Sequence, residues 1–134
     1  MFLIQFDACN RKELGLSSIG FVLYYDGILM CKHFSIINDK VPDSNYAEYK
    51  ALIKALEFAL SYKIKDLIIE GDAKVLIQQI NKICNVNCEH IKPLYNKVVN
   101  LKNNFDSINF EHIYRKKNIM ADSLANQALY NYFK

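Results

Sequence analysis

SNYAEYKALIKALEFAL, residues 44–60, has the apolar spacing of a helix that packs one face against a core. Glu48 lies one turn before Leu52, at the border of the apolar stripe. A carboxylate in the first turn gains about 0.3–1 kcal/mol from the helix dipole, so Glu48 taken alone is an ordinary helix-end acid. The apolar residues recur at intervals of three and four and form one stripe: Tyr49, Leu52, Ile53, Leu56, Ala59 and Leu60.

The composition is that of one globular domain spanning residues 1–134, with 51% hydrophobic and 23% charged residues. No run approaches the roughly 20 apolar residues of a membrane span, and Met1 to Phe6 lack the features of a signal peptide. The four cysteines stand at irregular spacings, as expected in a reducing compartment. We therefore expect an intracellular protein without membrane contact, most simply a monomer. The net charge of +3 is a weak indication of an anionic partner.

The segment Cys84-x-x-x-Cys88-x-His90 contains half of a zinc-binding pattern. A structural zinc site takes four ligands, and no fourth ligand stands at a matching spacing. The pattern alone does not predict a metal site.

The chain alternates strand and helix patterns in the order βββαβααβα. Residues 8–17 are expected to form a turn, and Asp26-Gly27 predicts a tight hairpin. Ser44 or Asn45 is expected to cap the central helix. Three strands with tight connections followed by helical crossovers predict a five-stranded mixed α/β sheet with helices on its faces. The expected strands cover 2–7, 19–25, 28–37, 65–70 and 107–114, and the expected helices cover 44–62, 73–83, 91–105 and 120–132.

Four acids interrupt apolar context at the ends of these elements. Asp7 ends the first strand, Asp72 follows the fourth strand, and Asp122 lies in the first turn of the last helix, in addition to Glu48. Ligands of open α/β sheets gather beyond the carboxyl ends of the strands, so Asp7 and Asp72 would meet there if their strands are parallel neighbours.

Two carboxylates 4 Å apart repel by about 4 kcal/mol at an effective dielectric near 20. A cluster of them needs cations, and oxygen ligands favour Mg²⁺ or Mn²⁺. Periodicity alone does not establish that all four acids converge.

The chain resembles a type 1 ribonuclease H over essentially its whole length. The element order is the one that family uses. Four segments carry the resemblance, the last of them the most specific: Phe6-Asp7, Asn45-x-x-Glu48-x-x-Ala51-Leu52, Glu70-Gly71-Asp72 and Asn118-x-x-Ala121-Asp122-x-Leu124-Ala125.

The resemblance implies a ribonuclease H-like fold and an enzyme that hydrolyses the RNA strand of RNA/DNA hybrids. It implies that Asp7, Glu48, Asp72 and Asp122 are catalytic and bind two Mg²⁺ or Mn²⁺ ions. The implied products carry 5′-phosphate and 3′-hydroxyl ends. Asn45 matches a residue that contacts the minor groove of the hybrid, where the 2′-hydroxyl distinguishes RNA from DNA. The other substrate-binding residues that the resemblance suggests are Asn10, Lys74, Arg115 and Asn118.

The chain departs from the family pattern in three places. The turn after the first Asp lacks the Gly-rich, Asn-Pro-containing sequence, and the basic protrusion of some members is missing between Cys84 and Glu89. Arg115, Lys116 and Lys117 occupy the loop where many members carry a mobile His, as in the compact branch of the family. Strand alternation predicts that His112 packs against the core, and Arg115 is placed to approach the scissile phosphate or to form a solvated basic loop.

Three functions remain open at this stage. The first is an active hybrid-cleaving nuclease, which the four acids favour. The second is a nucleic-acid-binding module that kept the fold and lost activity, which the altered first turn and the missing protrusion favour. The third is a nuclease of the same fold that acts on another structured nucleic acid.

Overall fold

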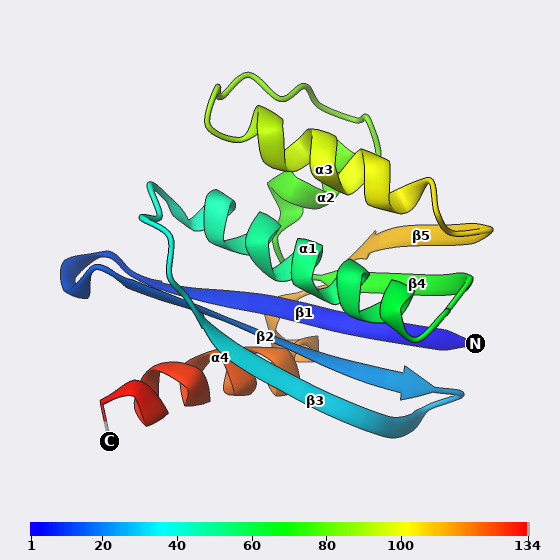
Figure 1. Cartoon of the computed structure of the whole chain (residues 1–134), viewed down its shortest axis with the longest axis horizontal. Helices are drawn as coiled ribbons and strands as arrows, with labels where there is room; N and C mark the ends of the chain where they lie inside the picture. Colours follow the sequence, from blue (N-terminus) through cyan, green and yellow to red (C-terminus); the bar gives the residue numbers. More distant parts are fainter. Residues whose placement is uncertain (134) are drawn as a thin grey trace.

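A five-stranded mixed sheet with the strand order β3-β2-β1-β4-β5 forms the centre of the structure, a computed structural model that describes residues 1–133 (Figure 1). The pairs β1–β2 and β2–β3 are antiparallel, whereas β1–β4 and β4–β5 are parallel. The predicted element order and the mixed sheet are therefore confirmed. The strands are β1 (Phe2–Arg11), β2 (Leu16–Tyr25), β3 (Ile28–Ile37), β4 (Asp66–Gly71) and β5 (Ser107–His112). The helices are α1 (Ser44–Ser61), α2 (Lys74–Ile80), α3 (Lys92–Lys102) and α4 (Ile119–Tyr132), with single 3₁₀ turns at Lys12–Leu14 and Arg115–Lys117.

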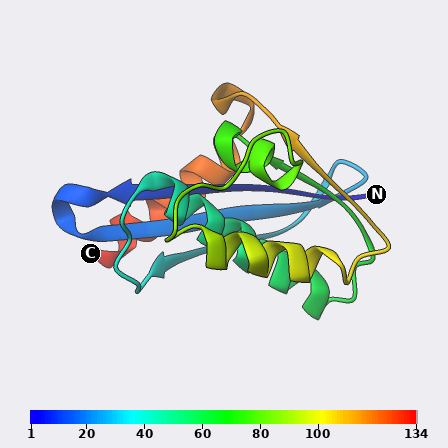
Figure 2. The same cartoon turned by 90° about the horizontal axis from the view of Figure 1, so that it is seen from above.

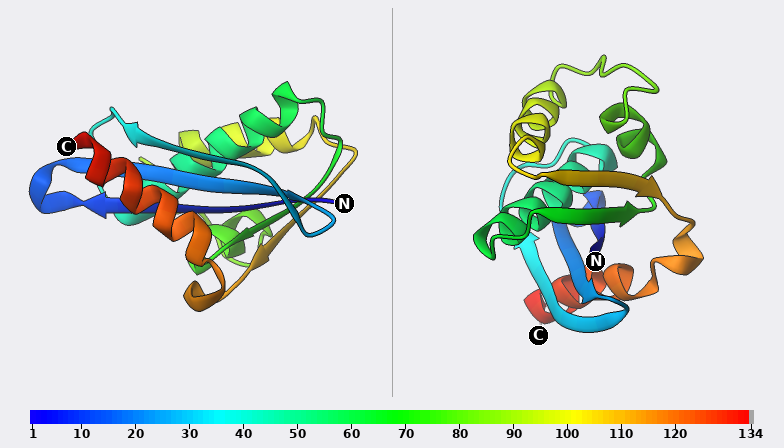
Figure 3. Two further views of the ribbon diagram at one scale, coloured as in Figure 1. Left: turned by 90° about the horizontal axis from the view of Figure 1, so that it is seen from below. Right: turned by 90° about the vertical axis from the view of Figure 1, so that its right-hand side faces the viewer.

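The helices cover both faces of the sheet, as the sequence predicts. Helices α1, α2 and α3 lie on one face and α4 lies on the other, which Figure 2 and the side view in Figure 3 show from two further directions. The apolar stripe of α1 is fully buried at Tyr49, Leu52 and Leu56, opposite Ile4 and Phe6 of β1. Within residues 1–133, no helix is both long enough and apolar enough to cross a membrane.

The first hairpin is longer than predicted. Residues 8–11 continue β1 and Leu16 already begins β2, so most of the expected turn at 8–17 is paired strand. Asn10 and Ser17 are direct partners in this ladder, and the Ser17 hydroxyl donates to Asn10 Oδ1 at 2.8 Å. Polar residues that are common in turns thus stabilise a ribbon here, and Gly15, at φ 64°, reverses the chain.

The ends of several other elements also differ from prediction. Asp43 caps α1 in place of Ser44 or Asn45, because its Oδ1 accepts a hydrogen bond from Tyr46 N at 2.8 Å. Helix α2 ends at Ile80, since Lys82 takes a positive φ of 61° and breaks the helical path. The other differences are of one to three residues and leave the topology unchanged.

Helix α4 packs unusually close to the sheet at Gly20. The hydroxyl of Ser18 donates to the carbonyl of Ala125, which joins β2 to α4. A side chain at Gly20 would meet backbone atoms of α4, so the residue is needed for space. Gly20 is the antiparallel partner of Asp7, and the close approach therefore brings α4 to the same level of the sheet as Asp7.

Candidate active site

Asp7 and Asp72 lie together where the pairing of β1 with β4 ends. The last parallel pair is Phe6 with Gly71, and each acid is the next residue along its strand or just after it. This confirms that the two strands are parallel neighbours. It also corrects one detail, because Asp7 does not end β1, which continues to Arg11 beside β2.

Glu48 lies close to these two acids and comes from α1, the helix on one face of the sheet. One carboxylate oxygen from each of Asp7, Glu48 and Asp72 lies within 4.8 Å of the others. Helix α1 directs Glu48 to this point because its buried stripe fixes the helix against β1. Asp122, in the first turn of α4, lines the same pocket of about 470 Å³ but is outside the three-acid cluster. The structure thus brings all four predicted acids to one pocket.

Burial and mutual repulsion raise the pKa values of Asp7 and Glu48. Burial raises the pKa of Asp7 to about 7; hydrogen bonds from the Glu48 carboxyl and Ala8 N–H oppose this rise, whereas the charges of Asp72 and Asp122 add to it. Burial also raises the pKa of Glu48 well above its usual value, and the neighbouring charge of Asp7 adds to this effect. The two carboxyls share a hydrogen bond that requires a proton on one of them. Without a cation, the cluster therefore holds a proton near neutral pH.

The chemistry of the cluster fits a hard divalent cation. Glu48 Oε1 is buried and has no hydrogen-bond partner within the described part of the chain. A buried carboxylate oxygen without a partner is costly, and a cation would satisfy it. All the converging ligand atoms are carboxylate oxygens, the type that Mg²⁺ and Mn²⁺ prefer.

We predict that the metal-free protein loses stability as the pH rises from about 5 to 8. In the folded state the pKa values of Asp7 and Glu48 are raised above those of the unfolded chain, 3.8 and 4.5. Their contribution to stability is fully present below the unfolded values and is lost as the pH passes through the folded ones. A rise of one pKa unit corresponds to about 1.4 kcal/mol, enough to shift the melting temperature by several degrees.

Thermal unfolding in a chelating buffer at a series of pH values measures this effect. Saturating Mg²⁺ should raise the melting temperature more at pH 8 than at pH 5, because it replaces the shared proton. Glu48→Gln should flatten the pH dependence, whereas Asp66→Asn, an exposed acid at the start of β4, should leave it unchanged. An equal slope in Glu48→Gln and the wild type would contradict the assignment.

The predicted substrate-binding residues divide into two groups. Asn10 and Arg115 line the pocket with the acids, and Arg115 is exposed in the 3₁₀ turn before α4. Asn45 at the start of α1 and Lys74 at the start of α2 do not line it. Asn45 nevertheless lies in the first turn of α1, the helix that carries Glu48. Lys74 lies in the first turn of α2, which begins two residues after Asp72.

Asn118 and His112 take positions that differ from prediction. Asn118 is fully buried and donates from Nδ2 to the carbonyl of Phe6 at 2.9 Å, so it contacts β1 and not the pocket. His112 is exposed and lines the pocket, because β5 is an edge strand that ends at this residue, beyond the part of the face that the helices cover.

Tyr114 also lines the pocket and was not among the predicted site residues. The residue is 69% exposed, and its ring lies edge-on to His112, with ring centroids 5.6 Å apart. An exposed aromatic residue directly before a basic run is typical of nucleic-acid surfaces, and this was the signal in the sequence.

The Cys84-x-x-x-Cys88-x-His90 segment does not gather ligand atoms in residues 1–133. Both cysteines are exposed, and His90 Nε2 lies 2.6 Å from Asp43 Oδ2, the other oxygen of the α1 cap. The imidazole therefore connects the loop before α3 to the start of α1.

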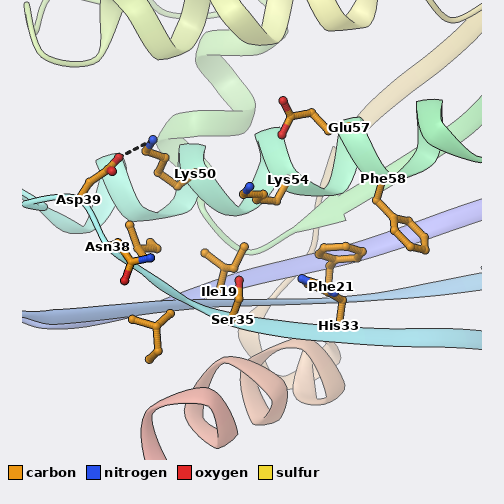
Figure 4. A pocket seen from close by; sticks show the side chains of 12 residues that line it. Ile19, Phe21, His33, Ser35, Asn38, Asp39, Lys50, Lys54, Glu57 and Phe58 are labelled. Atoms are coloured by element: carbon orange, nitrogen blue, oxygen red, sulfur yellow. Dashed lines mark ion pairs between the residues drawn. The ribbon is translucent and has the colours of Figure 1, made fainter. Parts of the chain in front are cut away.

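A larger hollow lies on the other side of α1, between that helix and β2–β3 (Figure 4). Its volume is about 630 Å³. Phe21 and His33 stack on its floor with centroids 4.9 Å apart, and Lys50 pairs with Asp39 at its end. No set of converging carboxylates lines this hollow within residues 1–133, so size alone does not identify the functional site.

The fold and the acid cluster define a ribonuclease H-like protein, and comparisons with known proteins agree. A family model described as reverse transcriptase-like matches residues 5–128. The chain is 31% identical to ribonuclease HI of Halobacterium salinarum over 92% of its length. The structure of RNase H1 from that archaeon superposes with a TM-score of 0.91 at 30% identity, covering 97% of this chain and 98% of the other. The chain belongs to the type 1 ribonuclease H family.

A second solved structure, of LC11-RNase H1, contains an RNA/DNA hybrid. It superposes over the full length of both chains with a TM-score of 0.91 at 26% identity. The chain spans 62% of the length of the curated Halobacterium protein and 24% of that of a Mycobacterium tuberculosis bifunctional protein that it matches at 31% identity. These relatives therefore contain segments beyond the region shared with this chain.

Proposed function

We propose that the protein is a metal-dependent endonuclease that hydrolyses the RNA strand of RNA/DNA hybrids and leaves 5′-phosphate and 3′-hydroxyl ends. The observation that carries this proposal is the convergence of Asp7, Glu48 and Asp72 within 4.8 Å, with a buried oxygen of Glu48 left without a partner. The hybrid bound to a related RNase H1 supports the choice of substrate.

The four acids of the pocket would hold two Mg²⁺ or Mn²⁺ ions. Two such ions, when bound, supply the charge that activates a water and stabilises the leaving oxygen of a phosphodiester. The acids offer a converging, partly buried set of oxygens, and the parallel strand ends and α1 fix three of them before substrate arrives. Such prior ordering lowers the cost of reaching the reacting geometry.

Basic and polar residues around the pocket would hold the nucleic acid. Arg115 lies on the pocket wall and would contact a phosphate near the scissile bond. Asn10 lies on β1, three residues after Asp7, and also lines the pocket. Asn45 and Lys74 lie at the starts of α1 and α2. We also propose that the protein acts as a monomer inside the cell, which agrees with its four free thiols.

Cleavage assays on matched substrates test the proposal. The full chain should cut the RNA strand of a labelled hybrid with Mg²⁺ or Mn²⁺, leave duplex RNA and duplex DNA intact, and do nothing in a chelating buffer. Equal cutting of duplex RNA or duplex DNA would indicate a nuclease with another substrate. Binding of the hybrid without cleavage in either ion would indicate an inactive binding module.

A further inference from the structure

The fourth acid of the pocket, Asp122, is held differently from the other three. Asp7, Glu48 and Asp72 form one tight cluster, and Asp122 lies outside it on a helix from the opposite face of the sheet. A free Asp side chain has several rotamers of similar energy, so a separate contact is needed to keep this carboxylate aimed at the cluster.

Asn126 supplies such a contact from one turn further along α4. Its Nδ2 donates to the backbone carbonyl of Asp122 at 2.9 Å and to Asp122 Oδ1 at 3.3 Å. Residues four apart on a helix are neighbours on its surface, so this pairing follows from the spacing. It is the one side-chain hydrogen bond to the Asp122 carboxylate within residues 1–133.

The orientation of the Asn126 amide is fixed from β1. The thiol of Cys9 donates to Asn126 Oδ1 at 3.5 Å, which leaves Nδ2 to face Asp122. Cys9 stands two residues after Asp7 on the same strand. The hydrogen bonds therefore run from the strand that carries the first acid, through Asn126, to the acid on α4.

Asn118 anchors the same helix one turn before Asp122. Its Nδ2 donates to the carbonyl of Phe6, the residue before Asp7, and its own carbonyl accepts from Asp122 N at 3.1 Å. Helix α4 is thus tied to β1 on both sides of Asp7, by residues spaced four before and four after Asp122. The contact made by Asn118 sets the position of the helix, whereas the orientation of the Asp122 side chain depends on Asn126.

We propose that Asn126 is a positioning residue that holds the Asp122 carboxylate toward the three-acid cluster, oriented by Cys9. The proposal rests on the proposed function, since it deepens the account of the same site. Partners that orient a metal-binding group typically change metal affinity or activity by about 10–100-fold when removed. Asn126→Leu keeps a similar side-chain volume and removes both the donor and the acceptor.

Mn²⁺ binding to the metal-free protein, measured by calorimetry, tests the proposal in a double-mutant cycle. Asn126→Leu should weaken Mn²⁺ binding by about tenfold in the wild-type background and by less than twofold in Asp122→Ala. Asn131→Leu, the same change at an exposed position of α4, should have no effect. An equal loss in both backgrounds, or no loss in either, would overturn the proposal.

A metal-independent measurement covers the case in which Mn²⁺ binding is too weak to resolve. Three-bond couplings between Hα and Hβ of Asp122 should show one side-chain rotamer in the wild type and averaging in Asn126→Leu. Cys9→Ser keeps a donor and should behave like the wild type, whereas Cys9→Ala should show partial averaging. Averaging already in the wild type would overturn the proposal, even if the protein cleaves hybrids; a single rotamer would support it even if cleavage is absent.

Discussion

Asp72→Asn should reduce hybrid cleavage by at least about three orders of magnitude, or roughly 4 kcal/mol of transition-state stabilisation. Asp72 is one of the three acids whose oxygens converge within 4.8 Å, and the amide removes one negative charge and one carboxylate oxygen that would bind a metal ion. Binding of divalent ions at this site depends on accumulated carboxylate charge. The substitution hardly changes side-chain volume, so the loss should come from chemistry and not from folding.

Two further measurements separate the loss of activity from the loss of structure. The metal-free variant should melt at or above the wild-type temperature at pH 8, since the charge of Asp72 helps to raise the pKa values of Asp7 and Glu48. Asp66→Asn, the same change at the exposed first residue of β4, the strand that leads to Asp72, should retain full cleavage. Full cleavage by Asp72→Asn would show that the metal site is elsewhere.

The sequence was sufficient to predict the element order and the mixed sheet, because the apolar residues of each helix and strand recur at the spacing typical of that element. The apolar stripe of α1 and the Asp26-Gly27 hairpin each specify a local structure, and right-handed crossovers leave few ways to join them. The sequence predicted that Asp7 and Asp72 meet only on the condition that their strands are parallel neighbours, and the pairing of β1 with β4 fulfils that condition.

The parts that sequence reasoning missed depend on contacts between distant residues. Asn118 fits a family motif, yet its role in this structure is a buried hydrogen bond to Phe6, 112 positions away. His112 is at a strand position whose alternation predicts a buried side chain. It is exposed because it ends the edge strand β5, beyond the part of the sheet that the core covers. The local spacing of residues does not predict the hydrogen bond between Asn10 and Ser17 or the contact between the Cys9 thiol and Asn126.

Gly20→Ala should destabilise the protein by at least about 3 kcal/mol, at the upper end of what overpacking costs, and lower the melting temperature by roughly 10 °C. The added Cβ would lie 2.6 Å from Ala125 N and 2.8 Å from Ala121 O, both backbone atoms of α4. Side chains can move away from such a contact, whereas a helix backbone can only shift as a whole. The position of α4 against β2 therefore depends on the absence of a side chain at Gly20.

The same substitution should also reduce cleavage by more than the loss of stability explains, measured at a temperature where the variant is still folded. Gly20 is opposite Asp7 in the ladder, so a helix that moves off the sheet there carries Asp122 away from the other acids.

Gly27→Ala is the matched control. Its φ of 81° makes alanine strained, but no atom lies within 4 Å of the added Cβ, so it should cost only about 1–2 kcal/mol and leave cleavage unchanged. If Gly20→Ala melted like the wild type, α4 could not lie as close to the sheet as the structure has it, and the link between that contact and the fourth acid would fail with it.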